Sequence, residues 1–93
     1  MTLDNFLNEN GKDQTDKSNE YIRNIYQIIL ESGKKGIEYR EIISKLKLKQ
    51  KEKQNFVNYM LSHYCRKLVN YGMIVVSSKM INKGTNIRIA KCR

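Results

Sequence analysis

The sequence predicts a small, mainly α-helical domain that closes with a β-hairpin. Apolar residues recur at helical spacing in three segments before Gly72, and after this glycine the pattern becomes short, β-branched and alternating. The chain has 93 residues, enough for one hydrophobic core but not for two. The stretch from Asn8 to Ser18 is polar and without periodicity. Ahead of it, Leu3, Phe6 and Leu7 could form one side of a short helical turn that either frays or docks on a partner subunit. We therefore expect a flexible N-terminal segment over residues 1–18 and one folded domain over residues 19–93.

The first helix is expected to begin with Ser18 or Asn19 as N-cap and to continue to about Ser32. Gly33 follows its last periodic residue, as a helix-ending glycine does. A short extended piece is expected next, over residues 36–38, and it leads directly into the second helix.

The second helix is expected from Tyr39 to about Leu48, with apolar residues inward and basic residues outward. After a lysine-rich connector, the third helix is expected from about Glu52 to Tyr71, ending at Gly72. Downstream, MIVVSS and TNIRIAK are typical of two strands, and the intervening NKG is typical of a turn. The expected order is therefore helix, short strand, helix, helix, strand, turn, strand.

Charge gives the first indication of function. The chain has 18 Lys and Arg against 9 Asp and Glu, a net charge of +9. The first 20 residues hold 2 basic and 5 acidic residues, so the remaining 73 hold 16 and 4, a net charge of +12. A body this positive favours a polyanion, because phosphates release counterions when it binds. Nucleic acid is the leading partner class, with an anionic membrane surface and plain solubility as alternatives.

Other functional classes fit the sequence poorly. No apolar run approaches the roughly 20 residues of a membrane-spanning helix, and the polar start is unlike a signal peptide. We therefore expect a soluble, intracellular protein. One His and two Cys, His63 and Cys65 among them, are too few for a zinc site or a catalytic centre, and there is no CxxC pair. We expect no enzyme activity, cofactor, metal or small-molecule ligand.

The third helix presents the candidate recognition surface. A helical wheel at about 100° per residue separates a core side from a polar side. The core side is expected to hold Val57, Leu61, Tyr64, Cys65 and Leu68. The polar side offers amides, hydroxyls and a guanidinium for base edges and phosphates, and an aromatic ring suited to a thymine methyl group. Its residues are Asn55, Tyr59, Ser62, His63, Arg66, Lys67 and Asn70. An ordinary solvated helix face is the alternative.

The succession of elements resembles the winged helix-turn-helix fold. In KLVNYGMIVV, residues Leu68, Gly72, Met73 and Ile74 match those that join the recognition helix to the wing in MarR-like regulators. The match covers about residues 19–93. In size and in its Lys/Ile/Asn-rich composition the chain is also similar to small winged-helix proteins encoded by viruses of hyperthermophilic archaea. The resemblance implies sequence-specific binding of double-stranded DNA and regulation of transcription, in the host cytoplasm for a viral protein.

Further DNA contacts are expected, in the wing from the resemblance and in the connector from the position of its lysines. The wing tip lies along the DNA backbone or enters the minor groove in this fold, and the lysines before the third helix are placed to meet phosphates. The wing residues are Lys83, Asn86 and Arg88. The connector lysines are Lys49, Lys51 and Lys53. A solvated turn and solubility charges are the alternatives, and the connector is longer than the tight turn of the family.

A homodimer on a pseudo-palindromic site is expected, with the third helices in successive major grooves. The first helix is apolar on more sides than a single small domain covers, which favours an interface there. The expected interface residues are Ile22, Ile25, Ile29, Phe6 and Leu7. The alternatives to a regulator are a winged-helix protein-docking module and a nonspecific nucleic-acid-binding protein.

The two cysteines, Cys65 and Cys92, raise a question of oxidation state. In an ordinary cytosol both would stay thiols, with Cys65 as a small buried residue. The resemblance to proteins of hyperthermophile viruses implies instead a disulfide bond between them, within one chain or between two.

Overall fold

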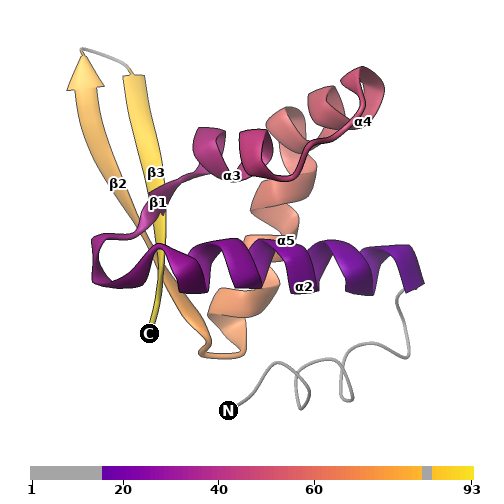
Figure 1. Ribbon diagram of the computed structural model, residues 1–93. Helices are drawn as coiled ribbons and strands as arrows, with labels where there is room; N and C mark the ends of the chain where they lie inside the picture. Colours follow the sequence, from indigo (N-terminus) through magenta and orange to yellow (C-terminus); the bar gives the residue numbers. More distant parts are fainter. Residues whose placement is uncertain (1–15, 83–84) are drawn as a thin grey trace.

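The computed structural model describes residues 16–82 and 85–93 of the chain (Figure 1). It is mostly helical with a small antiparallel sheet, as the sequence predicts, and the expected order of elements is confirmed. The elements are α2 (Asp16–Glu31), η2 (Gly33–Lys35), β1 (Ile37–Glu38), α3 (Tyr39–Lys45), α4 (Gln50–Asn55), η3 (Phe56–Met60), α5 (Leu61–Asn70), β2 (Ile74–Asn82) and β3 (Thr85–Cys92).

The start of α2 differs from the prediction, because Ser18 and Asn19 lie inside the helix rather than at its N-cap. Contacts with the third helix account for the extra turn. The Tyr64 hydroxyl donates a hydrogen bond to Ser18 Oγ at 3.2 Å, and Lys17 Nζ lies 3.5 Å from Glu52 Oε2. Tertiary contacts here outweigh the local capping signal. Part of the segment expected to be flexible thus belongs to the folded domain.

Two glycines turn the chain between α2 and the sheet. Gly33 has a φ of 65° and Gly36 a φ of 79°, both in the left-handed region. A Cβ atom at Gly36 would lie 2.9 Å from Ile89 Cγ2 and 3.0 Å from the Ala90 carbonyl oxygen. Glycine at position 36 therefore permits the close approach of β1 to β3.

The connector after α3 begins and ends earlier than the sequence indicates. The helix ends at Lys45, and Lys47 has a φ of 51°, the left-handed conformation that commonly terminates helices. Because α4 begins at Gln50, Lys51 and Lys53 lie within its first turns rather than in the connector.

The third helix runs without a break through α4, η3 and α5, and η3 is a π-helical turn. The Leu61 N–H donates to the carbonyl oxygen of Phe56, five residues earlier. Such a turn inserts one residue, which rotates the preceding part of the helix by about 100°. Phe56 is consequently buried at 2% exposure, and Val57 is 64% exposed. The prediction that Val57 faces the core is wrong, since burying the larger aromatic ring is worth more.

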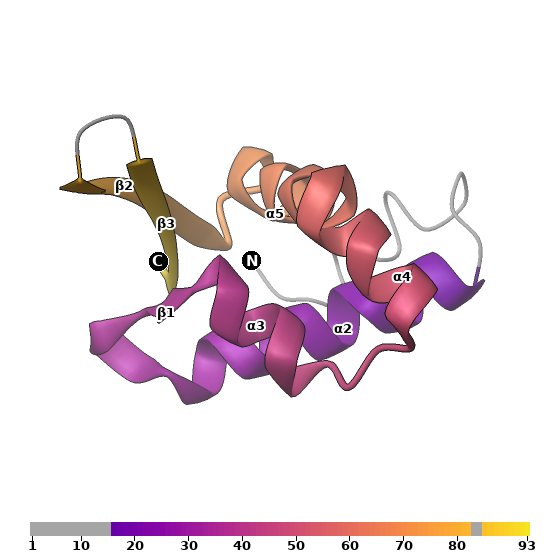
Figure 2. The ribbon, with the colours of Figure 1, turned by 90° about the horizontal axis from the view of Figure 1, so that it is seen from above.

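The sheet has the order β1-β3-β2, with β3 paired to both neighbours. In the hairpin register, Val76 lies opposite Ala90 and Ser78 opposite Arg88, so these four residues share one face. This face is buried at Ala90 and becomes exposed and polar at Ser78 and Arg88. Figure 2 shows the hairpin and α5 side by side, across the molecule from α2.

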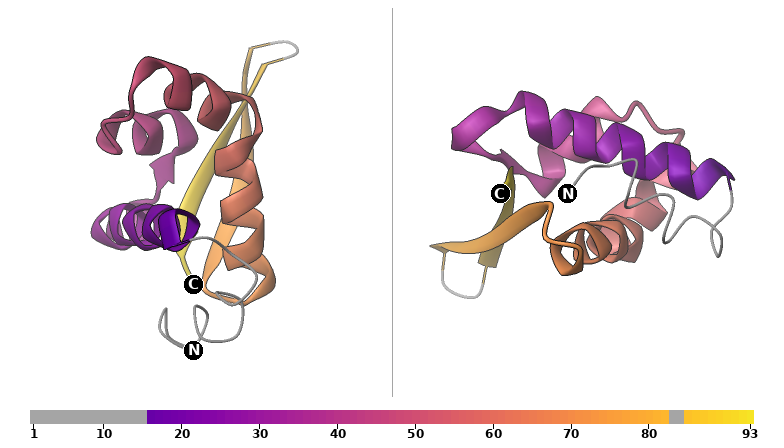
Figure 3. Two further views of the ribbon diagram at one scale, coloured as in Figure 1. Left: turned by 90° about the vertical axis from the view of Figure 1, so that its right-hand side faces the viewer. Right: turned by 90° about the horizontal axis from the view of Figure 1, so that it is seen from below.

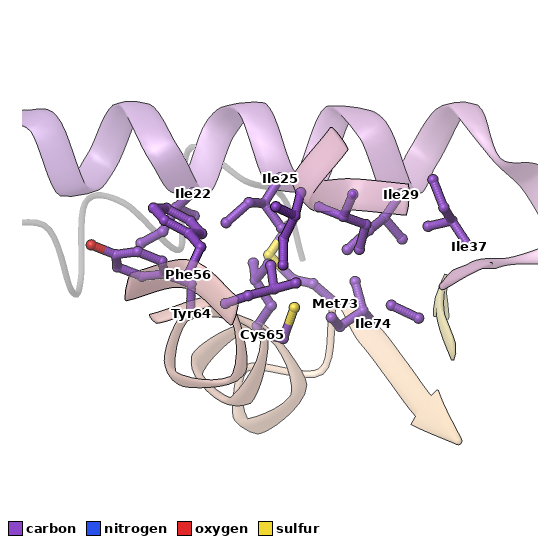
Figure 4. Close-up of a cluster of buried hydrophobic side chains, with 14 residues drawn as sticks. Ile22, Ile25, Ile29, Ile37, Phe56, Tyr64, Cys65, Met73 and Ile74 are labelled. Carbon is purple, nitrogen blue, oxygen red and sulfur yellow. The ribbon is translucent and has the colours of Figure 1, made fainter. Parts of the chain in front are cut away.

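The hydrophobic core lies between α2 and the pair formed by α5 and the hairpin (Figures 3 and 4). Its buried residues are Ile22, Ile25, Ile29, Ile37, Ile42, Ile43, Phe56, Leu61, Tyr64, Cys65, Leu68, Met73, Ile74 and Ala90. Within residues 16–82 and 85–93, no helix has the length and apolarity that crossing a membrane requires.

The expected dimer interface on the first helix needs correction. Ile22, Ile25 and Ile29 are each 0% exposed, because the chain's own core covers them. These isoleucines offer no surface to a second copy. The other two expected interface residues, Phe6 and Leu7, lie outside the described residues.

Candidate nucleic-acid interface

Positive charge is concentrated in one part of the domain. Residues 16–38, from α2 through β1, hold 4 basic and 4 acidic residues, a net charge of zero. Residues 39–93 hold 13 basic and 2 acidic residues, a net charge of +11, and no acidic residue follows Glu52. The excess charge of the chain therefore belongs to α3, the third helix and the hairpin.

Glu52, one of these two acidic residues, is engaged by α2. It accepts a hydrogen bond from the Tyr21 hydroxyl and forms an ion pair with Lys17, its Oε2 lying 3.5 Å from Nζ. The hydrogen bond from Tyr21, with the charge of Lys17, holds the pKa of Glu52 below its usual value. The carboxylate is thus stabilised by residues of α2, away from the arginines of α5 and the hairpin.

Three adjoining hollows lie between the third helix, α3 and the hairpin. Their volumes are about 410, 550 and 260 Å³, and all three are lined by Tyr39 and Ser62. We call their combined surface the basic groove, because four cations and no carboxylate line it. The cations are Arg40, Lys53, Arg66 and Arg88. Arg40 also has Glu38 Oε2 beside it, at 3.8 Å from Nη2.

Arg88 joins the hairpin to the third helix across this groove. Its Nη1 donates a hydrogen bond to Ser62 Oγ at 3.4 Å. Behind the pair lies Tyr39, whose pKa is raised by burial and by the neighbouring Cys65, although the Arg88 charge partly opposes the shift. The phenol therefore stays neutral and retains its hydroxyl proton at physiological pH. Hairpin and helix side chains thus form one continuous surface.

The polar face expected on α5 divides into two stripes at helical spacing. One stripe borders the basic groove and consists of Ser62, Arg66 and Val69. The second stripe lies about 100° further around the helix axis from the first. It consists of His63, Lys67 and Asn70, of which Lys67 is half-buried and the other two are exposed. The predicted side chains therefore lie outside the core, but the structure brings only Ser62 and Arg66 together with the hairpin.

Two predicted contact residues, Asn55 before the π-helical turn and Tyr59 within it, lie outside the basic groove. Asn55 is exposed and Tyr59 is 62% exposed, but neither lines the groove. The groove contains instead two residues that the sequence reasoning missed, Arg40 and Val57. The spacing of five between Phe56 and Leu61 is the signal that indicates the shift in helical phase.

Of the hairpin residues expected to contact DNA, Asn86 and Arg88 line the groove, together with Ile87. Lys83 lies outside the described residues. Of the three lysines expected to contact phosphates, Lys53 lines the groove, and Lys49 and Lys51 are exposed and do not line it.

Both cysteines are free thiols, in contrast to the disulfide that the resemblance implies. Cys65 is 0% exposed, and burial raises the pKa of its thiol to about 12. A fully buried thiol has no access to a second chain. Cys92 is half-buried and neighbours Tyr26. In the part of the chain that the structure describes, no three His, Cys, Asp or Glu side chains gather as metal ligands would.

Comparison with known proteins gives no match. No protein-family model, no curated protein and no solved structure matches the chain significantly.

Proposed function

We propose that this chain is a winged helix-turn-helix protein that binds double-stranded DNA sequence-specifically and regulates transcription. The third helix enters the major groove and the hairpin acts as the wing. The proposal rests above all on the contact between Arg88 and Ser62, at 3.4 Å, which unites the cations of hairpin and helix on one surface. A carboxylate-free surface of this kind attracts phosphates.

The order of elements supports the winged-helix part of the proposal. The first strand precedes α3, pairs with β3, and so fixes the base of the hairpin beside the second and third helices. The hairpin in turn lies alongside α5 (Figure 2). This places the polar part of the hairpin face, with Ser78 and Arg88, next to the candidate recognition helix.

The groove contains side chains suited to phosphate contacts, which supply affinity, and a side chain suited to base contacts, which supply specificity. Lys53 and Arg40 are suited to phosphates, whose contacts position a protein on the duplex without reading its sequence. Arg66 is suited to a guanine edge, which accepts two hydrogen bonds from a guanidinium in the major groove. This combination distinguishes a sequence-specific reader from a solely electrostatic binder.

The proposal concerns a single chain. The isoleucines expected at a dimer interface are core residues, so the dimer has no assigned surface on the described part of α2. The symmetry of the preferred DNA site measures the number of bound copies: a two-fold motif indicates two chains, and an asymmetric motif indicates one.

The experiment that tests the proposal is selection of preferred sites from randomised duplexes, followed by binding titrations of two charge-matched variants. The double variant Arg66→Ala with Arg88→Ala removes two cations from the groove. The control, Lys34→Ala with Lys35→Ala, removes two exposed cations from η2. We expect about 100-fold weaker binding of the selected site by the groove variant, from two contacts each worth about 1–3 kcal/mol. The control should change affinity less than about threefold, because its cations lie outside the groove.

Equal losses in the two variants would show that net charge alone drives binding, as in a nonspecific nucleic-acid binder. Enrichment of no sequence would contradict specific recognition. Binding to duplexes that does not weaken with added salt would also contradict the proposal, because phosphate contacts are salt-dependent. A protein-docking module would give neither a selected site nor salt-sensitive DNA binding.

A further inference from the structure

Val57 is an exposed aliphatic side chain in the middle of a basic surface. It is 64% exposed and lines two of the three hollows of the groove, both together with Arg40 and Ser62. Lys53, one helical turn earlier, borders one of these hollows. A solitary surface valine is ordinary in itself. Val57 combines three polar or cationic neighbours with an exposure that is well above the 36% of Val69, the other exposed valine of the groove.

The backbone places Val57 in this position. The five-residue hydrogen bond from Leu61 to Phe56 puts the phenyl ring in the core and turns the next residue outward. An uninterrupted α-helix would direct Val57 to the side of Leu61 and Cys65, as the helical wheel predicts. π-Helical turns of this kind are frequent at functional sites. The π-helical turn thus places Val57 in the groove instead of the core.

The major groove of DNA contains one apolar group that an aliphatic side chain can contact, the 5-methyl group of thymine. Arginine, lysine and serine read phosphates and polar base edges, whereas an aliphatic side chain suits a methyl group. Ile87 and Val69 also line the groove, but Ile87 is half-buried and Val69 is 36% exposed, so Val57 is the most exposed of these three aliphatic side chains. Tyr59 is also exposed, but it lies outside the groove.

We infer that Val57 contacts the methyl group of a thymine in the bound duplex and determines the preference for thymine at that base pair. This inference rests on the proposed function. It adds a specificity-determining residue and the base that this residue reads.

The test replaces each thymine of the selected site with deoxyuridine, one position at a time, because uracil pairs like thymine and lacks the methyl group. At one position per bound chain, we expect the wild-type protein to bind about fourfold more weakly, the loss for roughly one buried methyl-sized group. For Val57→Ala, the thymine and uracil duplexes should bind equally at that position. Affinities are measured by fluorescence anisotropy under one salt condition.

Leu30→Ala provides the matched control, because Leu30 is another aliphatic residue that is 49% exposed, on α2. This variant should keep the full uracil effect. Thermal melting followed by circular dichroism establishes that both variants are folded, as expected for two exposed positions.

The inference is overturned if the selected site contains no thymine, or if Val57→Ala remains as sensitive to uracil as the wild type at every position. In either case tight binding of the selected site leaves the proposed function intact. Failure of the wild type to select or bind any duplex overturns the proposed function and the inference together.

Discussion

The helix α2 and the third helix are both amphipathic, and they bury their apolar sides in the same core from opposite directions (Figure 3). Their other sides differ. Residues 16–38, from α2 through β1, have equal numbers of basic and acidic residues, whereas residues 39–93 have 13 against 2. The periodicity that identifies a helix is therefore similar in the two regions. The balance of charge on the outward sides separates a covering helix from a candidate recognition helix.

Aliphatic side chains show the same contrast. On α2 the three isoleucines at positions 22, 25 and 29 are completely buried. These side chains pack in the core of the domain and are not accessible to a ligand. On the third helix Val57 and Val69 are partly or largely exposed beside arginines and a lysine. Apolar groups left exposed among cations are available to a ligand, whereas the three buried isoleucines of α2 only stabilise the fold.

The largest expected effect on folding concerns Ile25, at the centre of the α2 stripe. Ile25→Ala should lower the free energy of unfolding by about 3 kcal/mol, because it removes buried methyl groups and leaves a cavity. For a domain of this size the melting temperature should fall by roughly 15 °C. Thermal melting followed by circular dichroism measures the loss.

Protein concentration sharpens this prediction. If Ile25 belongs to the core of one chain, the difference in melting temperature between the wild type and the variant should be the same at every protein concentration. A difference that vanishes at concentrations where the chain is monomeric would place these isoleucines in a subunit interface after all. Leu30→Ala, at a half-exposed position on the same helix, should change stability by less than about 0.5 kcal/mol.

A smaller effect on stability is expected from a substitution of Glu52, which lies where α2 contacts the third helix. Its pKa is lowered in the folded chain, chiefly by the hydrogen bond from Tyr21, so ionised Glu52 stabilises the fold. This contribution is present above the usual carboxyl pKa of about 4.3 and is lost as the pH falls through the lowered value. Glu52→Gln should therefore lower the melting temperature slightly at neutral pH and leave it unchanged in acid.

The measurement for Glu52 is a series of thermal melts across pH for the wild type and Glu52→Gln. Glu41→Gln, an equivalent change at an exposed position of α3, serves as control. The difference between wild type and Glu52→Gln should shrink as the pH is lowered. A difference that is constant with pH would show that the carboxylate charge contributes nothing to the attachment of the third helix to α2.

Most of the fold was predictable because its signals are local. Glycines at positions 33 and 72 mark the ends of helices, and the change in hydrophobic period marks the hairpin. The start of α2 was not predictable, because contacts of Lys17 and Ser18 with the third helix extend it. The π-helical turn was missed for a related reason. A wheel with a fixed angle per residue assumes one phase, and here burial of Phe56 changes the phase within a single helix.

The candidate site was predictable in its chemistry and only partly in its composition. Arg66, Ser62 and Arg88 were named from charge, pattern and family resemblance, and the structure brings them to one groove. Arg40 and Val57 were missed because their membership depends on tertiary placement. The dimer interface was misassigned because the sequence does not show how much of the apolar surface of α2 the hairpin and the third helix cover.

The contrast between the two regions is tested most directly by an NMR titration of the isotopically labelled chain with its selected duplex. We expect the backbone amide signals of residues 53–70 and 85–91 to shift most, and those of α2 to shift little. This result would place the DNA on the third helix and the hairpin. The largest shifts in α2, with the third helix unchanged, would contradict the account.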